Sequence, residues 1–190
     1  MGQQAAHAGR DWRSRLIMAE KLKARITHLE MQARPSVVVP TPAGLRLAIM
    51  RASDMPVHYY RYLYEEIGRE HHWQMRRKQS DAEVAEAIHA DINEIHVLYA
   101  DGNPAGFVEL DLSALPESVE ILYFGLMADY QGRGLGKFFL SEAISAAWAH
   151  SPQKLTIHTN TLDSPRALQL YQKMGFSAVS WTEEEVEPWV

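Results

Sequence analysis

Apolar positions recur with two different periods along the chain, and the change of period divides it into two parts. Over residues 11–32 they step by three or four residues, which predicts one narrow amphipathic helix that Pro35 stops. From Leu45 onward apolar residues alternate with other residues, which predicts a strand. The helix that follows is expected to end at Gly68, because glycine commonly terminates helices.

The rest of the chain predicts short strands and helices. Residues 80–83, Ser-Asp-Ala-Glu, form a capping box that opens a short helix, and the apolar runs on either side of the turn at 100–104 predict a β-hairpin. The expected elements that follow are a strand at 119–124, a helix ending near His150, a strand at 154–159, a helix stopped by Gly175, a strand at 176–181 and an acidic tail at 183–185. The order from Leu45 is β-α-α-β-β-β-α-β-α-β, a mixed α/β layer structure.

The segment 125–137 places three glycines within five positions, between the predicted strand at 119–124 and a helical pattern. Glycine lets a backbone approach a phosphate closely, and free N–H groups at a helix start attract anions. The spacing of Gly132, Gly134 and Gly136 fits neither the dinucleotide-binding fingerprint nor a P-loop. We therefore expect a different phosphorylated cofactor here, the alternative being a helix start that needs glycine only for turning and close packing.

Composition indicates an ordinary globular chain and excludes several kinds of site. A length of 190 residues with 46% hydrophobic residues suits one domain with an appendage. The absence of cysteine excludes disulfides, a thiolate nucleophile and a cysteine zinc site. The nine histidines lack the spacing of a zinc site, so no metal is expected. Without a signal-peptide pattern or a membrane-length apolar run, we expect a cytoplasmic protein that makes no membrane contact.

Charge is distributed unevenly. Residues 1–34 hold seven basic and three acidic side chains, a net charge of +4, and since the whole chain carries −5 the remainder carries −9. An acidic body argues against nucleic acid as a partner and weakly favours a cationic or amine-bearing substrate. The predicted helix at 11–32 could pack on its own chain, pair with a second copy in a homodimer, or lie on a membrane, and its interspersed acids weaken the membrane alternative.

Two motifs carry a resemblance to a known family. Residues 131–136, QGRGLG, fit Q-x-x-G-x-G after a strand, and residues 167–176, ALQLYQKMGF, fit A-x-x-L-Y-x-x-x-G-F. Over residues 45–181 the chain resembles the GCN5-related N-acetyltransferase (GNAT) superfamily. The resemblance implies an α/β GNAT fold, with a mixed, mostly antiparallel central sheet, a splayed parallel strand pair and helices on both faces. The division that we expect is an N-terminal amphipathic helical extension at 1–34 and an acetyltransferase domain at 35–190.

The resemblance implies acetyl-coenzyme A as the cofactor and assigns residues to it. The pantetheine arm would pair with backbone groups near Leu126 and Ala128, and N–H groups of residues 132–137 would hold the pyrophosphate. The cofactor-binding residues expected on this basis are Leu126, Met127, Ala128, Gln131, Gly132, Arg133, Gly134, Leu135, Gly136, Lys137, Asn160 and Ser164. The sequence departs from the family at Ala128, where proline is frequent, and at Ser164, where asparagine is frequent; Asn160 or Ser164 would supply the missing polar contact.

The implied chemistry is direct attack of a primary amine on the thioester. Tyr171 matches the family tyrosine that protonates the departing thiolate, and packing beside the cofactor without proton transfer is the alternative. Glu120 is the favoured general base, because it lies eleven residues before Gln131, as the glutamate base does in the histone-acetyltransferase branch. The alternatives are Glu109, His158 and a water chain.

The acceptor side is less defined by the sequence. The aromatic and basic cluster at 59–78 is expected to line it, and Trp73, Glu109 and Tyr123 are the expected substrate-binding residues. The acceptor amine itself and the use of longer acyl groups stay open. The alternative function is a non-catalytic module that binds coenzyme A and acts as a sensor or interaction unit, because a fold alone does not fix an activity.

Overall fold

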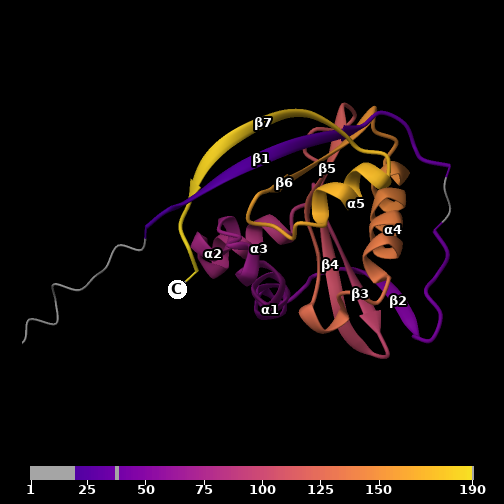
Figure 1. Cartoon of the computed structure of the whole chain (residues 1–190). Helices are drawn as coiled ribbons and strands as arrows, with labels where there is room; N and C mark the ends of the chain where they lie inside the picture. The colour runs from indigo at the N-terminus through magenta and orange to yellow at the C-terminus, as the bar shows by residue number, and fades with distance from the viewer. Residues whose placement is uncertain (1–19, 37–38, 190) are drawn as a thin grey trace, which may run out of the picture.

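A seven-stranded sheet with helices on both faces forms the body of the protein (Figure 1). The computed structural model describes residues 20–36 and 39–189. The strand order is β2-β3-β4-β5-β6-β1-β7. The strands are β1 (Leu22–Met31), β2 (Leu47–Ala52), β3 (Asn93–Ala100), β4 (Asn103–Asp111), β5 (Ser118–Leu126), β6 (Lys154–Asn160) and β7 (Ser177–Val186). The helices are α1 (Val57–Gly68), η2 (Arg69–His71), α2 (Met75–Lys78), α3 (Asp81–Ile88), η3 (Ala128–Tyr130), α4 (Leu135–Ala149) and α5 (Ala167–Lys173).

One parallel pair interrupts an otherwise antiparallel sheet. β5 and β6 run parallel, and they pair only from Ser118 to Ile121 on β5 and from Lys154 to Ile157 on β6. Beyond these residues β5 continues to Leu126 without pairing to β6, so the two strands separate. The predicted GNAT fold, with its splayed parallel pair and helices on both faces, is confirmed.

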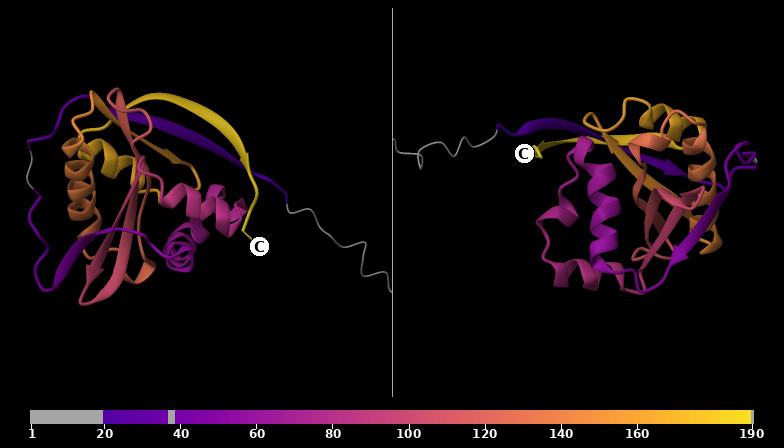
Figure 2. Two further views of the ribbon diagram at one scale, coloured as in Figure 1. Left: turned by 180° about the vertical axis from the view of Figure 1, so that it is seen from behind. Right: turned by 90° about the horizontal axis from the view of Figure 1, so that it is seen from below.

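Helices lie on both faces of the sheet (Figure 2), and each face carries its own hydrophobic core. α4 and α5 cover one face, where Phe139 and Leu140 pack against strand residues such as Ile121. α1 and α3 cover the other face, where Leu63 and Val84 are fully buried. Each helix buries one apolar stripe on its side of the sheet, which is the arrangement expected of a three-layer α/β domain.

The predicted N-terminal helix is wrong over Leu22–Met31, which form β1 between β6 and β7. Residues 11–19 of that prediction lie outside the described residues. Side chains of a strand alternate between faces, and β1 buries Ala24 on one face but Leu29 and Met31 on the other. Because the buried face changes along the strand, the apolar positions step by three at that point and imitate a helical period.

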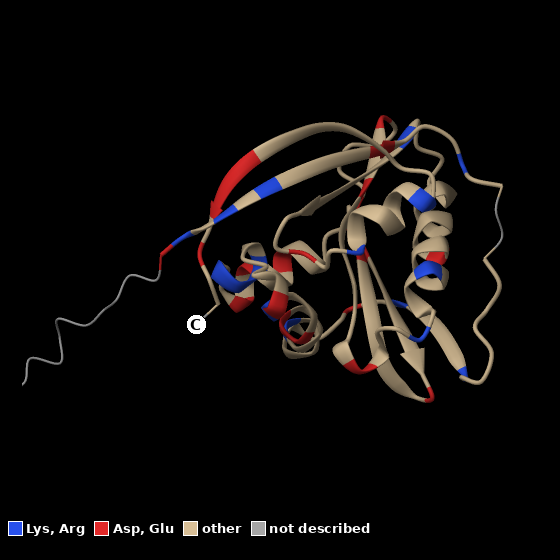
Figure 3. Cartoon of the chain, viewed as in Figure 1, with Lys and Arg blue, Asp and Glu red and all other residues tan. Residues whose placement is uncertain are grey.

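β1 and β7 form a long two-stranded ribbon that arches past the rest of the sheet toward α2 (Figure 1). The expected acidic tail at 183–185 is part of β7, a correction to the sequence analysis. Lys23 pairs with Glu185 and Arg25 with Glu183 across the two strands, so basic and acidic side chains face each other along the ribbon (Figure 3). Within the described residues, none of the helices combines the length and apolar character needed to cross a bilayer.

Candidate active site

A cleft of about 390 Å³ opens where β5 and β6 separate. Its lining comes from both sides of the sheet: Ala167, Leu170 and Tyr171 belong to α5, whereas Trp73 and Gln74 belong to the segment before α2. The gap between the parallel strands therefore connects the two faces of the sheet. A molecule in this cleft would pass through the sheet, with one end beside α4 and α5 and the other beside α2.

The glycine loop forms the entrance on the α4 side. Gly132 and Gly134 have φ angles of +73° and +79°, and a Cβ on either would meet no atom within 4 Å. Glycine is thus required by the backbone conformation and not by crowding. Gly134 is the N-cap of α4, and no side chain caps this helix start. The first N–H groups of a 15-residue helix are therefore available for an anion, and Gly132 and Gly136 line the cleft beside them.

The separated edge of β5 offers backbone groups to the cleft. Leu126 pairs with Gly106 and Phe124 with Val108 on β4, while the N–H of Met127 donates to the carbonyl oxygen of Ala105. In an antiparallel ladder this pattern turns the N–H and C=O of Leu126 and Phe124 away from β4, toward the gap. The Gln131 side chain donates from Nε2 to the Leu126 carbonyl oxygen at 3.3 Å, which ties the glycine loop to this edge.

Tyr171 lies on α5 beside the same gap. Its side chain is buried between Phe124 and Phe176, and it lines the cleft. Burial, with a smaller contribution from the negative charge of Asp163, raises the pKa of the Tyr171 phenol well above its ordinary value. The phenol is therefore fully protonated at neutral pH and has the form that a proton donor needs.

Glu120 and His158 form a pair on the opposite face of the sheet. The Oε1 atom of Glu120 lies 3.0 Å from Nδ1 of His158. His158 lines the cleft, whereas Glu120 is not among the lining residues. The hydrogen bond that the Glu120 carboxylate accepts from the imidazole raises the pKa of His158, although burial acts in the opposite direction. The favoured base of the sequence analysis is thus one residue removed from the cleft surface.

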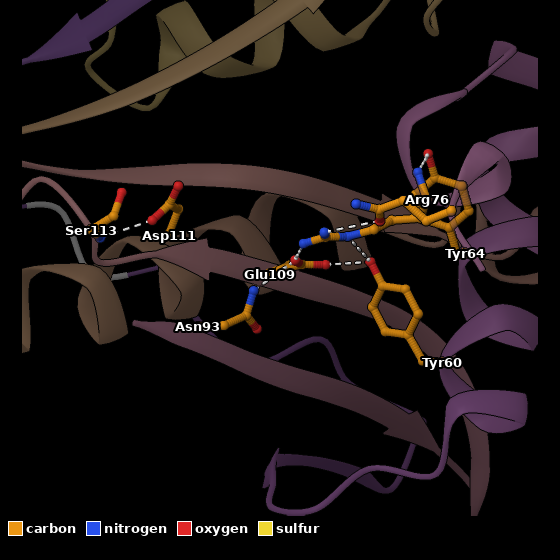
Figure 4. A network of polar contacts seen from close by, with 8 residues as sticks. Tyr60, Tyr64, Arg76, Asn93, Glu109, Asp111 and Ser113 are labelled. Atoms are coloured by element: carbon orange, nitrogen blue, oxygen red, sulfur yellow. Dashed lines mark hydrogen bonds and ion pairs between the residues drawn. The ribbon is translucent and has the colours of Figure 1, made fainter. Parts of the chain in front are cut away.

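The predicted substrate residue Glu109 lies outside the cleft, in a buried polar network (Figure 4). Its carboxylate forms an ion pair with Arg76, accepts a hydrogen bond from the Tyr60 hydroxyl at 2.5 Å and accepts another from Asn93 Nδ2 at 2.7 Å. It is fully buried, and all of these partners belong to the protein itself. We therefore assign Glu109 to holding α2 against the sheet and withdraw it as a base and as an acceptor contact.

Aromatic side chains form the end of the cleft beside α2. Trp73 and Tyr123 both line it, with ring centroids 5.0 Å apart. Burial raises the pKa of Tyr123 far above its ordinary value, so this side chain is a neutral wall. Glu184 and Val186, near the end of β7, complete this end. Sequence analysis missed the contribution of β7 because it interpreted 183–185 as a tail. The available signal was that basic residues near the start of the chain could pair with these acidic residues across two strands.

The remaining predicted cofactor residues fall into two groups. Gln131, Asn160 and Ser164 line the cleft. The Asn160 side chain accepts a hydrogen bond from the Leu162 N–H at 2.7 Å, and the Ser164 hydroxyl accepts one from the Arg166 N–H at 3.4 Å, so both shape the loop before α5. The predicted residues that are not among the lining side chains are Met127, Ala128, Arg133, Gly134, Leu135 and Lys137.

These residues lie around the cleft without lining it. Leu135 is fully buried in the core under the loop, and Met127 is buried among the aromatic side chains of the other face. Arg133 and Lys137 are exposed next to the glycine loop, and the Arg133 guanidinium stacks 5.3 Å from the Tyr130 ring centroid. Both cations would reinforce an anion at the start of α4. Among the residues with described placement, no group of three or more histidine, aspartate or glutamate side chains is arranged to hold a metal ion.

Comparison with known proteins agrees with this geometry. A family model described as the acetyltransferase (GNAT) family matches residues 55–176. No curated protein sequence matches the chain. The matched range includes the glycine loop, the β5–β6 pair and Tyr171.

Solved structures share the fold at low sequence identity. A GCN5-related N-acetyltransferase from Kribbella flavida is 16% identical, with a TM-score of 0.54, over 88% of this chain and 60% of that chain. One from Sphaerobacter thermophilus is 13% identical, with a TM-score of 0.58, over 90% and 54%. The aminoglycoside N-acetyltransferase AAC(6')-Iy, in complex with CoA, is 17% identical, with a TM-score of 0.53, over 74% and 94%. The chain spans between 53% and 66% of the length of the first four structures that it matches.

Proposed function

The chain belongs to the acetyltransferase (GNAT) family, and from this premise we propose that it is an enzyme that transfers an acetyl group from acetyl-coenzyme A to a primary amine. One observation carries the proposal. An uncapped helix start after a glycine loop, an unpaired edge of β5 and the buried phenol of Tyr171 all meet at one cleft. A phosphate site, a site for an extended amide arm and a proton donor are what this donor requires.

The donor would lie on the α4 side of the cleft. N–H groups of residues 132–137 would hold the pyrophosphate, with Arg133 and Lys137 nearby as cations. Backbone groups of Phe124 and Leu126 face the gap and would pair with the pantetheine amides. When bound, the coenzyme supplies a thioester, whose carbonyl carbon accepts the amine.

The chain's own groups would then act on the charges that develop. The backbone N–H of Leu126 would stabilise negative charge on the carbonyl oxygen, because a fixed donor in a dry site costs no reorganisation. The Tyr171 hydroxyl would donate its proton to the departing sulfur. Its buried position and raised pKa support this role, since a phenolate could not donate.

The acceptor would enter on the α2 side. Trp73 and Tyr123 provide apolar walls, and the carboxylate of Glu184 lies at the same end of the cleft. A neighbouring negative charge attracts an ammonium group, and the aromatic rings suit the methylenes or the cation beside it. These contacts support an amine-bearing acceptor without selecting one compound.

The alternative is a module that binds coenzyme A without turnover. The measurement that separates the two is release of free coenzyme A thiol from acetyl-coenzyme A, with and without ethanolamine, a polyamine, an aminoglycoside or a lysine peptide. Amine-dependent thiol release is the expected outcome. Binding of the coenzyme without release in any of these mixtures would favour the binding module.

A further inference from the structure

His158 lies at the branch point of the cleft. It is on β6, one residue beyond Ile157, the last residue that pairs with β5. Its side chain is on the sheet face opposite to the core beneath α4 and α5, because its neighbour Ile157 belongs to that core. His158 is therefore beside the acceptor end, whereas Tyr171 is at the donor end. The two groups flank the place where the strands separate.

The two ring nitrogens of His158 have different surroundings. Nδ1 is 3.0 Å from the Glu120 carboxylate, and no described residue forms a hydrogen bond with Nε2. A carboxylate next to Nδ1 selects the tautomer in which Nδ1 carries the proton and Nε2 holds the free lone pair. The carboxylate also stabilises the cation that forms when Nε2 takes up a second proton.

Other titratable groups surround His158, and the carboxylates among them reinforce this effect. His28 on β1 pairs with it across the strands, with ring centroids 6.2 Å apart. The charges of Asp163, in the loop before α5, and of Glu184 on β7 act in the same direction as that of Glu120 on the pKa of His158. Besides His158, the cationic or potentially cationic side chains that line the same cleft are His71, His72 and Arg166, whose positive charge would oppose protonation of His158.

We propose that His158 is the catalytic base that removes a proton from the acceptor ammonium, and that Glu120 is the residue that positions it. This inference rests on the proposed function, and it differs from direct use of Glu120. The Glu120 carboxylate does not line the cleft, and one of its oxygens is engaged by His158. A substrate amine in the cleft would meet the imidazole first.

The proton balance of the reaction follows from these positions. Nε2 of His158 takes one proton from the ammonium group, and the neutral nitrogen forms its bond to the carbonyl carbon as the carbon–sulfur bond breaks. Tyr171 donates its phenolic proton to the departing sulfur. The nitrogen then loses a second proton, which passes through water and restores the Tyr171 hydroxyl. The His158 imidazolium then returns its proton to solvent, so each turnover releases one proton and leaves both side chains as they began.

The test compares an acceptor that needs deprotonation with one that does not. Ethanolamine is an ammonium ion at neutral pH, whereas hydroxylamine is largely neutral. In His158→Gln, kcat/KM for ethanolamine should fall by ~10²–10⁴ near neutral pH, because a positioned base contributes that much. With hydroxylamine the same variant should lose less than about threefold, because the first deprotonation is not needed.

The pH profile and a direct titration identify which group is the base. Since the pKa of His158 is raised, the acid limb of the parent kcat/KM profile should lie above the ordinary histidine value of about 6.5. Glu120→Gln removes the main cause of that shift, so the kcat/KM profile of this variant should still have an acid limb, at a lower pH than in the parent. An NMR titration of the His158 ring should show the same displacement without any acceptor present.

A matched control is available elsewhere in the chain. His150 Nε2 lies 3.1 Å from Glu94 Oε2, a histidine–carboxylate pair that does not line the cleft. His150→Gln should leave both the acid limb and the ratio of the two acceptors unchanged.

Different results would overturn the role of His158 and the proposed function. Loss of the acid limb in Glu120→Gln, equal losses of the two acceptors in His158→Gln, or an NMR titration of His158 below the ordinary value would overturn the inference, with the proposed function intact. A parent protein that transfers acetyl to neither amine would count against the proposed function, and the NMR titration would then decide the Glu120–His158 pairing alone.

Discussion

Tyr171 is the side chain on which the donor half of the chemistry depends most directly. It is buried beside the gap, and burial keeps its phenol protonated. Tyr171→Phe retains the ring that packs between Phe124 and Phe176 and removes only the hydroxyl. We expect kcat to fall by ~10²–10⁴, the usual contribution of a positioned proton donor, while the Kd of acetyl-coenzyme A changes little. Steady-state kinetics and calorimetry measure the two quantities separately.

Tyr59→Phe is the matched control for that substitution. The Tyr59 hydroxyl is 3.0 Å from that of Tyr99, and neither residue lines the cleft. Its loss should cost some stability and leave kcat unchanged. If Tyr171→Phe keeps kcat within twofold of the parent, Tyr171 only packs beside the donor.

Gly134, like Gly132, has a backbone conformation that strains any residue with a side chain. At a φ of +79°, alanine would cost about 1–2 kcal/mol, as left-handed backbone does for other L-residues. Gly134→Ala should therefore lower the free energy of unfolding of the ligand-free protein by about that amount. Gly136 has ordinary φ, and a Cβ there would meet its nearest neighbour, Leu170, at 3.7 Å.

Gly136→Ala is the corresponding control. In ligand-free protein it should be neutral or slightly stabilising, because alanine has the higher helix propensity. Urea unfolding monitored by circular dichroism measures both variants. Equal effects of the two substitutions would contradict the assignment of strain to position 134.

The local motifs are the part of the site that the sequence could predict. Gly132, Gly134 and Tyr171 act through short-range patterns, and their placement beside the cleft needs only a strand, a turn and two helices. The His158–Glu120 pair depends on the register between β5 and β6, which no local pattern encodes. The pairing of Glu109 is equally non-local: only the fold shows that Arg76, thirty-three residues earlier in the chain, lies beside it in the core.

Among the elements, α2 is held to the sheet by the buried Glu109–Arg76 pair (Figure 4). α2 is a single turn, Met75–Lys78, and the segment before it supplies Trp73 and Gln74 to the cleft. Arg76→Met would leave the Glu109 carboxylate buried without its counter-ion, so we expect a loss of ~3–5 kcal/mol in the free energy of unfolding. Chemical denaturation measures this loss.

Two further variants check the physical reason. Lys78 on α2 forms an exposed ion pair with Glu187, 3.0 Å apart, and Glu187→Gln should lower the free energy of unfolding far less than Arg76→Met, because solvent screens exposed pairs. The double substitution Arg76→Met with Glu109→Met removes both charges and should recover much of the loss. A double variant as unstable as Arg76→Met alone would show that packing, and not the unpaired charge, is responsible.

Most elements were predictable because each buries one face against one layer. The capping box at 80–83 is present at α3, and the expected hairpin is β3–β4. β1 is the exception, since its buried side changes between Ala24 and Leu29. The sequence pattern alone cannot show that a strand buries one face at its start and the other face at its end. The apolar residues of β1 are three residues apart where this change occurs, and this spacing resembled that of a helix.

For the whole molecule, the separation of β5 and β6 is the central feature. The gap connects a face built by α4 and α5 with a face bounded by α2 and β7, so that donor and acceptor would approach from opposite sides. The exposed cations Arg133 and Lys137 lie beside the glycine loop, whereas the α2 side carries both Glu184 in the cleft and the exposed cations Arg77 and Lys78 on α2. An anionic donor would meet the cations beside the glycine loop, and the ammonium group of an acceptor would meet the carboxylate of Glu184.

Binding of acetyl-coenzyme A to the parent protein tests this account most directly. A ligand at 100 times its Kd stabilises the folded state by about 2.7 kcal/mol, which for a chain of this size corresponds to a rise in Tm of roughly 5–10 °C. We predict such a rise in a thermal unfolding experiment, with a smaller rise in Gly134→Ala when each is compared with its own ligand-free Tm. An unchanged Tm at millimolar acetyl-coenzyme A would contradict the assignment of the cleft as an acyl-coenzyme A site.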